Sequence, residues 1–351
     1  KAQHHDKYEI GILHLKTGEI EERFNAIADN VHNLEHKTSK SILFKVVNKL
    51  SQGQLAKKQK TLLERTIQSV TAYNYDIIYA NTAVALPVGV EIKKASKNKP
   101  KLIAHIHELN LILNQSLKEK TIFKSVDKVI AVSKLVKDNL KRNWEVKDKN
   151  ISVVYEFSKI NLKEKIVTKN NSKFVVGASG LAHWRKGYDL FIQVARYVKT
   201  NYKDKSIVFC WVGKILEKEK QVLEADLEKL ELKSTVKFVG QQQNPYSFFK
   251  DFDVFLMTSR EDPFPLVCIE VGMLGKPIIC FDKATGTQEM LTNGGGKIVP
   301  YLNIEQMSKE IINYYDDRGQ LQKDSKIVKT AFSDFSPDKQ CPKIYDTINQ
   351  L

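Results

Sequence analysis

Short apolar runs alternate with segments of helical periodicity along most of the chain. In the first half, the runs that predict strands are Tyr8–Leu13, Asp76–Tyr79, Lys101–Ile106, Lys128–Val132 and Ile151–Val154. In the second half they are Phe174–Ala178, Ile207–Val212, Val236–Val239, Val254–Met257, Pro277–Phe281 and Lys297–Val299. Helical patterns such as Ala56–Tyr73 and Lys134–Asn143 lie between them. This order predicts an α/β protein with two Rossmann-like, doubly wound domains, each a parallel sheet with helices on both faces.

The stretch Ser158–Ser172 is polar and rich in lysine, which is typical of a linker. We therefore expect a first domain over residues 1–160 and a second over residues 161–335, facing each other across a central cleft. A last helix around Pro342–Leu351, within residues 336–351, would cross back to the first domain. The opening KAQHHDK leaves no room for the strand and helix that normally precede one like Tyr8–Leu13, so we expect that roughly thirty residues are absent there.

Composition places the chain among soluble globular proteins. Of its 351 residues, 42% are hydrophobic and 28% are charged, and the length suffices for two domains. Its apolar runs stay short of the about 18 residues that indicate a membrane span, and its start carries no signal-peptide pattern. The four cysteines are scattered and form no CxxC pair, which is typical of reduced core thiols in a cytoplasmic protein.

The net charge of +15 is unevenly distributed. Residues 1–160 hold 28 Lys and Arg against 17 Asp and Glu, whereas the other 191 hold 28 against 24. Between His36 and Leu63 there are seven lysines, no acid and several apolar side chains. The stretch Lys37–Lys60 therefore suits an anionic membrane surface, which would make the protein peripheral to the inner face of the membrane, or a polyanionic acceptor. A solvated helix face explains it equally well, and nucleic acid is disfavoured because no aromatic or Arg-rich pattern accompanies the lysines.

The segment Ser259–Pro277, SREDPFPLVCIEVGMLGKP, combines an acidic loop with a helix N-terminus. It follows the predicted strand Val254–Met257, and its helix, Leu266–Leu274, is expected to stop at Gly275 and Pro277. Asp262 and Glu270 are eight positions apart, so one carboxylate lies on the loop and the other within the helix. In an open α/β sheet, polar ligands collect at such a strand–helix junction.

Three segments in the same order resemble the retaining glycosyltransferases of family 4, which have the GT-B fold. They are Ser259–Pro277, FVVGASGLAHWRKGYDLF (Phe174–Phe191) and KLIAHIHEL (Lys101–Leu109), and the first is the most specific. The resemblance implies an acceptor-side first domain and a nucleotide-sugar-binding second domain. It also implies that a sugar moves from a nucleotide-diphosphate donor, linked to UDP or GDP, to an acceptor hydroxyl, without a cofactor.

The resemblance implies that the carboxylate segment binds the nucleotide-sugar donor. The family's spacing of an acid, seven residues and a Glu selects Asp262 rather than Glu261 as the partner of Glu270. Asp262 would accept hydrogen bonds from the sugar, and Glu270 would accept from the ribose hydroxyls. The loop around Phe264, Pro265 and Leu266 would cradle phosphate oxygens with its amides, although Pro265 has no N–H and stands where the family often has Gly. Capping of the helix is the structural alternative for the two acids.

Lys186 of the WRKG motif matches the family's phosphate-binding lysine, whose charge would stabilise the leaving diphosphate. The family usually places an Arg directly after the Gly that Gly180 matches, but this chain has Leu181 there. Arg185 is the nearest candidate to replace that guanidinium, and it could equally point to solvent.

His107 matches the family's His near the reacting carbon, and it follows an apolar strand. Its imidazole could hydrogen-bond a sugar hydroxyl or help to polarise the reacting centre. His105 lies on the same side of the strand and is assigned to the core. Glu108 and Asn81 are candidates for acceptor or sugar contacts, with turn capping as the alternative for Asn81.

Two further motifs are set aside. Asp251-Phe252-Asp253 spells the DxD of metal-dependent glycosyltransferases, but it leads directly into a strand, so Asp253 is interpreted as a strand-entry residue. The triplet Gly294–Gly296 precedes a strand and is expected to be a tight turn rather than a phosphate loop. Ligand spacing for a metal is not found elsewhere, so we expect no metal site.

The sequence thus predicts a retaining, metal-independent glycosyltransferase of polysaccharide or cell-envelope glycan synthesis, with a glycan or lipid-linked acceptor. Two other GT-B enzymes compete with this hypothesis: a sugar-nucleotide epimerase, and a phosphorylase, which lacks a context for its pyridoxal-phosphate lysine. The competitor from another class is an inactive nucleotide-sugar-binding protein, which the Leu181 departure leaves open.

Overall fold

The computed structural model describes residues 7–16, 18–34, 54–160 and 173–351, of which residues 54–60 are described by their backbone alone. The described chain divides into two compact units. The first comprises residues 1–104 and 121–127, and the second residues 105–120 and 128–351. The division falls within strand β4 (Lys101–Ile106).

The first unit contains three helices and three complete strands within its described residues. These are β1 (Gly11–His14), α1 (Glu21–Asn25), β2 (Asn30–Asn33), α3 (Gln54–Thr71), β3 (Ile77–Asn81) and α4 (Leu86–Ala95). Strand β1 overlaps the predicted Tyr8–Leu13, but it pairs in parallel with β2 in a separate two-stranded sheet. The sequence pattern missed β2 because its residues, NVHN, are mostly polar and lack the apolar alternation of a half-buried strand.

A second sheet has the order β3-β4-β5-β6. Strands β5 (Lys128–Ala131) and β6 (Ile151–Val153) pair in parallel. The helices that accompany them in the second unit are α5 (Asn110–Ser116) and α6 (Lys134–Trp144), together with the 3₁₀ helix η2 (Asp148–Asn150). Another 3₁₀ helix, η1, spans Lys120–Ser125. Ser133 begins α6 by accepting from the Val136 N–H, which is a regular N-cap.

The third sheet is six-stranded and parallel, with the order β12-β11-β10-β7-β8-β9. The strands are β7 (Phe174–Ser179), β8 (Ile207–Val212), β9 (Val236–Phe238), β10 (Val254–Met257), β11 (Ile278–Phe281) and β12 (Gly296–Val299). The helices of this part of the chain are η3 (Trp184–Lys186), α7 (Tyr188–Asn201), α8 (Glu217–Lys229), α9 (Tyr246–Phe249), α10 (Leu266–Met273), η4 (Gly286–Met290), α11 (Ile304–Asp316) and α12 (Arg318–Phe332), followed by α13 (Pro337–Asn349), which packs against β5. The chain runs outward from β7 to β9 and then from β10 to β12 on the other side. The strand order therefore reverses between β7 and β10, where such sheets bind their ligands.

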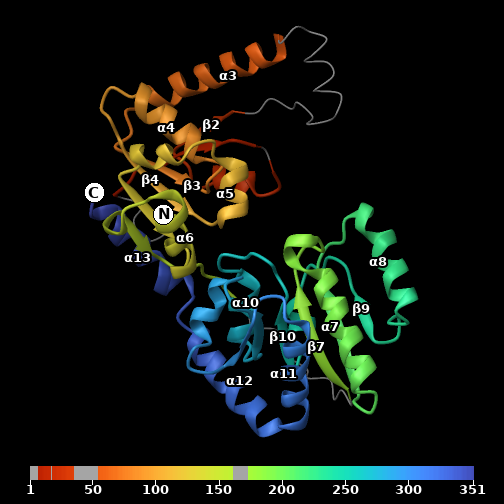
Figure 1. The fold of residues 1–351 in the computed structure, drawn as a ribbon. Coiled ribbons are helices and arrows are strands. Elements are labelled where there is room, and N and C mark those ends of the chain that lie inside the picture. The colour runs from red at the N-terminus through yellow and green to blue at the C-terminus, as the bar shows by residue number, and fades with distance from the viewer. Residues whose placement is uncertain (1–6, 17, 35–53, 161–172) are drawn as a thin grey trace. The chain divides into compact units, whose positions relative to one another are not determined.

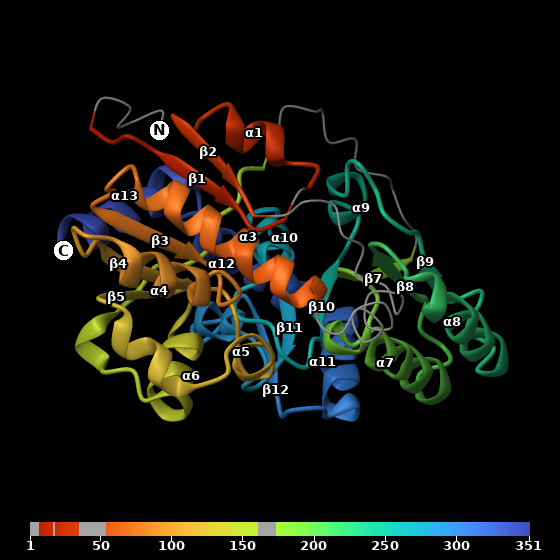
Figure 2. The same cartoon turned by 90° about the horizontal axis from the view of Figure 1, so that it is seen from above.

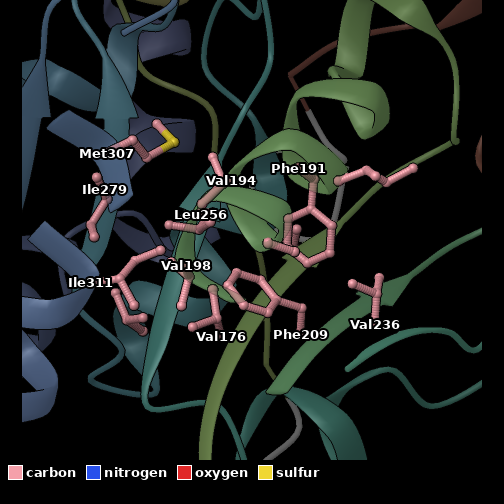
Figure 3. Close-up of a cluster of buried hydrophobic side chains, with 14 of the residues drawn as sticks. Val176, Phe191, Val194, Val198, Phe209, Val236, Leu256, Ile279, Met307 and Ile311 are labelled. Atoms are coloured by element: carbon pink, nitrogen blue, oxygen red, sulfur yellow. The ribbon is translucent and has the colours of Figure 1, made fainter. Parts of the chain in front are cut away.

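Helices cover both faces of this sheet, as doubly wound packing requires. On one face, α7 and α11 lie side by side (Figures 1 and 2). Side chains from these helices meet alternate strand residues in an apolar core, and Figure 3 shows Phe191 of α7 and Met307 of α11 there with Val176 and Phe209. On the other, α10 packs against α12 so closely that a Cβ at Gly272 would lie 2.5 Å from the Phe332 ring. The mixed α/β architecture with parallel sheets is confirmed.

The last helix, α13, lies within the expected residues 336–351 and begins at Pro337. Pro337 occupies the first turn, where its missing N–H costs nothing, and Ser336 precedes it in an extended conformation. Pro342, around which the helix was expected, lies inside it.

Candidate functional site

Two loops meet where the strand order reverses, one after β7 and one after β10. The Arg260 N–H donates to the Arg185 carbonyl at 2.8 Å, and the Thr258 hydroxyl donates to the Lys186 carbonyl at 3.2 Å. Gly187, at φ +71°, makes the approach feasible, since a Cβ there would lie 2.0 Å from the Thr258 carbonyl oxygen. The backbone therefore fixes the WRKG motif against the acidic loop.

Lys186 and Asp262 form the central ion pair of these loops. Lys186 Nζ lies 2.5 Å from Asp262 Oδ2, and Ser259 Oγ donates to the same carboxylate oxygen at 3.2 Å. Asp262 is only 5% exposed, so its charge needs these partners. Arg185 Nη1 donates to the Glu261 carbonyl at 2.7 Å and lies 3.8 Å from Asp262 Oδ1. The structure thus brings Arg185, Lys186 and Asp262 together, with the Arg185 guanidinium turned toward the acidic loop.

The two adjacent acids of this loop face different partners. Glu261 Oε1 accepts from the N–H of Leu111, in the first turn of α5, at 3.1 Å. Burial raises the pKa of Glu261, and the Leu111 N–H and the charge of Arg185 act in the opposite direction. Asp262 instead faces Lys186. The choice of Asp262 over Glu261 concerns a ligand role and stays a prediction.

Sequence reasoning missed a second support of the WRKG motif. Arg260 donates to both carboxylate oxygens of Asp189, at 2.9 and 2.7 Å, and to the Trp184 carbonyl at 2.6 Å. Its guanidinium also lies 4.8 Å from the centre of the Trp184 ring. Bidentate Arg–carboxylate geometry is rigid, so Arg260 fixes the loop that carries Lys186. The spacing of Arg260 and Asp189 in the sequence gives no sign of this pairing.

Gly180 lies in the loop after β7, with φ +144°. Its carbonyl accepts from the Trp211 indole N–H at 2.9 Å. A Cβ there would lie 3.4 Å from the Lys186 side chain, which is an ordinary contact, so the backbone angle rather than lack of space favours glycine. Leu181, which stands where the family has Arg, is 37% exposed.

Glu270, in the second turn of α10, is held by two hydroxyl groups. Ser158 Oγ donates to Glu270 Oε1 at 3.0 Å, and the Tyr246 hydroxyl donates at 3.3 Å. Burial raises the pKa of Glu270, and these two hydrogen bonds to its charged form counteract part of that effect. Ser158 had been assigned to a linker; the structure instead ties it to this helix and, through its N–H, to the Phe335 carbonyl at 3.0 Å.

The N-terminus of α10 presents backbone rather than side-chain donors. Its N-cap, Pro265, is extended, and within the described residues no side chain caps the helix. Leu266 is 47% exposed, whereas the Phe264 ring is buried beside Tyr155 and Phe335, at ring-centre distances of 5.0 and 5.3 Å. Phe264 could therefore meet a ligand only through its backbone, which is the role expected for it.

His107 follows β4 and is fixed on two sides. Its Nδ1 forms a short hydrogen bond with Glu156 Oε1, and its backbone N–H donates to Glu108 Oε2 at 2.9 Å. The ring of His105 lies with its centre 4.1 Å away. His105 is buried, as expected of a core residue, and burial together with the charge of His107 lowers its pKa to about 3. Glu156 was not among the predicted site residues, and its only local signal is its place after a predicted strand.

The remaining predicted positions, Asn81 and the basic stretch, belong to the first unit. Asn81 is the exposed last residue of β3 in the first unit, and Thr82 beside it has the unusual φ of +99°. The basic stretch Lys37–Lys60 lies largely outside the described residues, since only its last part, from Gln54, is placed in α3. The acceptor and membrane hypotheses for these residues stay predictions.

The two motifs that were set aside have structural roles. Asp253 Oδ2 accepts from the Val175 N–H at 2.7 Å, and Arg318 lies 3.3 Å from the other oxygen, so Asp253 joins β10 to β7. The turn Gly294–Gly296 leads into β12, and its Gly295 N–H donates to Asp324 at 2.8 Å. The strand-entry position of Asp253 and the turn at Gly294–Gly296 are as expected. Across the described residues, no cluster of three His, Cys, Asp or Glu side chains is arranged to hold a metal.

No helix in the described part of the chain is long and apolar enough to cross a membrane.

Comparison with known proteins identifies the family that the two parts of the chain match. The family model described as "Glycosyl transferases group 1" matches residues 159–333, and "Glycosyltransferase Family 4" matches residues 43–157. An uncharacterised glycosyltransferase of Methanocaldococcus jannaschii is 26% identical over 214 residues, which cover 58% of this chain and 49% of that protein. The lipopolysaccharide core biosynthesis glycosyltransferase LpsD of Rhizobium meliloti is 33% identical over 121 residues, 34% of this chain and 32% of LpsD. The matched segments thus span half or less of these relatives.

Among solved structures, HepE of Anabaena in complex with UDP superimposes with a TM-score of 0.75 at 20% identity, covering 97% of this chain and 92% of HepE. HepE has also been solved with UDP-glucose. At this identity the likeness concerns the fold, which is GT-B with two Rossmann-like domains.

Proposed function

Because the chain belongs to the group 1, family 4 glycosyltransferases, we propose that it moves a sugar from a nucleotide-diphosphate donor to an acceptor hydroxyl with retention of configuration. The observation that carries the proposal is the Lys186–Asp262 pair at the point of strand reversal, next to the N-terminus of α10. A cation, a carboxylate and free helix amides are the groups that a sugar diphosphate requires.

In the proposed mechanism, donor binding separates the ion pair. Lys186 and Arg185 turn to the diphosphate, and Asp262 accepts hydrogen bonds from the sugar hydroxyls. The amides of Phe264 and Leu266, on either side of Pro265, cradle the phosphate oxygens, and Glu270 accepts from the ribose hydroxyls. Gly180, whose N–H donates to the Val212 carbonyl, would contact the nucleotide sugar through its Cα rather than as a hydrogen-bond donor. These groups match the charge that grows on the leaving diphosphate.

The reaction itself needs little covalent chemistry from the protein. The bond between the anomeric carbon and the phosphate oxygen breaks, and its electron pair leaves with the diphosphate. The acceptor oxygen attacks on the face that the phosphate vacates, and a phosphate oxygen takes the acceptor proton. His107 contacts the reacting sugar and orients it, so that the enzyme contributes mainly position and electrostatic stabilisation.

We assign donor binding to residues 161–335 and acceptor recognition to residues 1–160, with Asn81 and Glu108 as candidate acceptor contacts and residues 336–351 returning to the first domain. HepE binds UDP and UDP-glucose, which supports a UDP-linked hexose over a GDP-linked one. LpsD acts in lipopolysaccharide core synthesis, which supports a glycan or lipid-linked acceptor. The lysines of Lys37–Lys60 would hold the enzyme at the anionic cytoplasmic face of a membrane.

The membrane part of the proposal is tested by flotation of the protein with liposomes that contain or lack anionic lipid. Each Lys near the surface adds about 1 kcal/mol of attraction, so we expect binding only to the anionic vesicles, with a decrease as salt rises. Equal binding to neutral vesicles would refute the electrostatic attachment.

The transfer proposal is tested by following donor hydrolysis and transfer to glycan acceptors. We expect turnover with a nucleotide sugar and a loss of about 100-fold or more in Lys186→Ala, because the leaving charge is then unmatched. Lys203→Ala, at an exposed position of the same unit, serves as the control. Donor binding without turnover on any acceptor would instead identify a nucleotide-sugar-binding protein.

A further inference from the structure

We propose that Glu156 is the positioning residue of His107: it fixes the orientation and tautomer of the imidazole that contacts the donor sugar. The inference rests on the proposed function of His107. It is carried by the hydrogen bond between Glu156 Oε1 and His107 Nδ1, which joins residues 49 positions apart in the sequence. Both side chains are largely shielded, with 22% and 24% exposure.

The pairing decides which ring nitrogen is available to substrate. An ionised carboxylate is only an acceptor, so the proton of the shared hydrogen bond resides on Nδ1. Nε2 then carries no proton in the neutral ring, so it is the nitrogen that can accept from a sugar hydroxyl. Without Glu156, the ring could rotate about its side-chain bonds or take the opposite tautomer, and the acceptor nitrogen would no longer be fixed.

The neighbours of the His107 ring make different contacts with this residue. Glu108 already accepts from the His107 backbone N–H, so it holds the main chain rather than the imidazole. His105 offers a neighbouring ring face at a centre distance of 4.1 Å. Glu156, by contrast, contacts a ring nitrogen of His107 directly.

Glu156 is itself held in place by its neighbours in the chain. It lies three residues beyond the end of β6. Immediately before it, the Tyr155 hydroxyl donates to Glu289 at 2.8 Å. Two residues after it, Ser158 donates to Glu270 through its hydroxyl and to Phe335 through its N–H. A segment anchored on both sides can hold a carboxylate in one position, which is what positioning of a functional side chain requires.

The test is a double-mutant cycle on turnover with His107→Ala, Glu156→Ala and both together. If Glu156 acts through His107, each single variant loses kcat by about 10- to 100-fold, as misplacement of a reacting group does, and the double variant is no slower than His107→Ala. Glu156→Gln, whose amide oxygen can still accept from Nδ1–H, recovers most of the loss. The donor KM changes less than kcat. Glu224→Ala, at an exposed helical position, is the control.

The inference would be overturned if the fold-losses in kcat of the two single variants multiplied in the double variant. It would also be overturned if Glu156→Ala kept the wild-type kcat while His107→Ala was impaired. A His107→Ala variant with full activity would refute the proposed role of His107 instead. A readout independent of turnover separates the two: ¹⁵N NMR of histidine-labelled protein at pH 8. We expect the Nδ1–H tautomer of His107 in the wild type and in Glu156→Gln, and its loss in Glu156→Ala. The Nε2–H tautomer in the wild type, or an unchanged spectrum in Glu156→Ala, would contradict the pairing.

Discussion

At the scale of single residues, the carboxylates and cations of the candidate site were found in the sequence, but the groups that orient them were not. Asp262, Glu270 and Lys186 stand at characteristic spacings within short segments. Their partners do not, since Ser158 reaches Glu270 across 112 residues and Glu156 reaches His107 across 49. Such contacts are created by the fold, and a single sequence carries no local signal of them.

The hydroxyls on Glu270 give the first prediction. Ser158→Ala and Tyr246→Phe each remove one hydrogen bond from the carboxylate, and a hydrogen bond contributes about 0.5–1.5 kcal/mol. We expect donor affinity to fall by roughly 2- to 10-fold in each variant. Calorimetric titration with the nucleotide sugar measures this. Tyr73→Phe, on an exposed tyrosine of the other unit, should leave the affinity unchanged; equal losses there would point to a general effect on the fold.

The same carboxylate gives a pH prediction. The pKa of Glu270 is raised by burial, and ribose hydroxyls need its ionised form as acceptor. Donor affinity is therefore present above that raised pKa and is lost as the pH falls through it. Because Ser158→Ala removes a hydrogen bond to the charged form, the loss should begin at a higher pH in that variant. Titrations between pH 4 and 8 would show parallel curves for the two proteins if this reasoning were wrong.

At the scale of elements, the strands of the second unit were well predicted because buried parallel strands are continuous apolar runs between turn residues. Strands β8 and β10 have the predicted bounds, Ile207–Val212 and Val254–Met257. The weak points were polar or short elements, such as β2, whose existence depends on tertiary pairing. The loops at the strand reversal depend on glycines and caps that propensity alone does not place.

Gly187 allows a prediction about these loops. In Gly187→Ala, the new Cβ would lie 2.0 Å from the Thr258 carbonyl oxygen, and φ is +71°. The left-handed backbone alone costs about 1–2 kcal/mol, and the clash adds to it. Gly240→Ala is the matched control, because φ is +74° and a Cβ there would meet nothing within 4 Å. We expect Gly187→Ala to lower the melting temperature and the donor affinity clearly more than Gly240→Ala does. Equal effects of the two substitutions would show that the contact between the two loops does not matter.

The hydrogen bonds of the buried Asp324 allow a prediction about stability and pH. Its Oδ2 accepts from the Tyr314 hydroxyl at 2.7 Å and from Gln320 at 2.9 Å, and Oδ1 accepts from the Gly295 N–H. Burial raises the pKa of Asp324, but these hydrogen bonds and Lys297 outweigh it, and the net shift is downward. Its contribution to stability is thus present above the unfolded pKa of about 4 and is lost as the pH falls through the lower folded value.

We therefore expect Asp324→Asn to cost about 1–3 kcal/mol at pH 7, since its amide would face other donors. The difference from the wild type should shrink as the pH falls below about 4. Denaturant unfolding across this pH range measures both effects. Asp204→Asn, whose side chain is 78% exposed, is the control. A difference that stayed constant with pH would contradict the assignment of the charge.

At the scale of the whole molecule, the α/β class and the GT-B fold followed from the order of elements together with three motifs. The match of two family models to residues 43–157 and 159–333 and the likeness to HepE agree with that prediction. Composition could limit the class of protein and the number of domains, but it could not identify the donor or the acceptor. Those depend on how side chains of distant segments shape a pocket, and the excess of lysine in the first 160 residues indicates only a general preference for anionic partners.

The central claim, a nucleotide-sugar site built on Lys186, Asp262 and Glu270, is tested most directly by thermal unfolding with a panel of UDP- and GDP-linked sugars. A ligand at 100 times its Kd stabilises the folded state by about 2.7 kcal/mol, which corresponds to a shift of about 4 °C for a chain of this length. We predict such a shift with one donor, expected to be a UDP-hexose, in the wild type and in Lys203→Ala, and its loss in Lys186→Ala and Glu270→Gln. A panel in which no nucleotide sugar raises the melting temperature, or an equal shift in Lys186→Ala, would contradict the account.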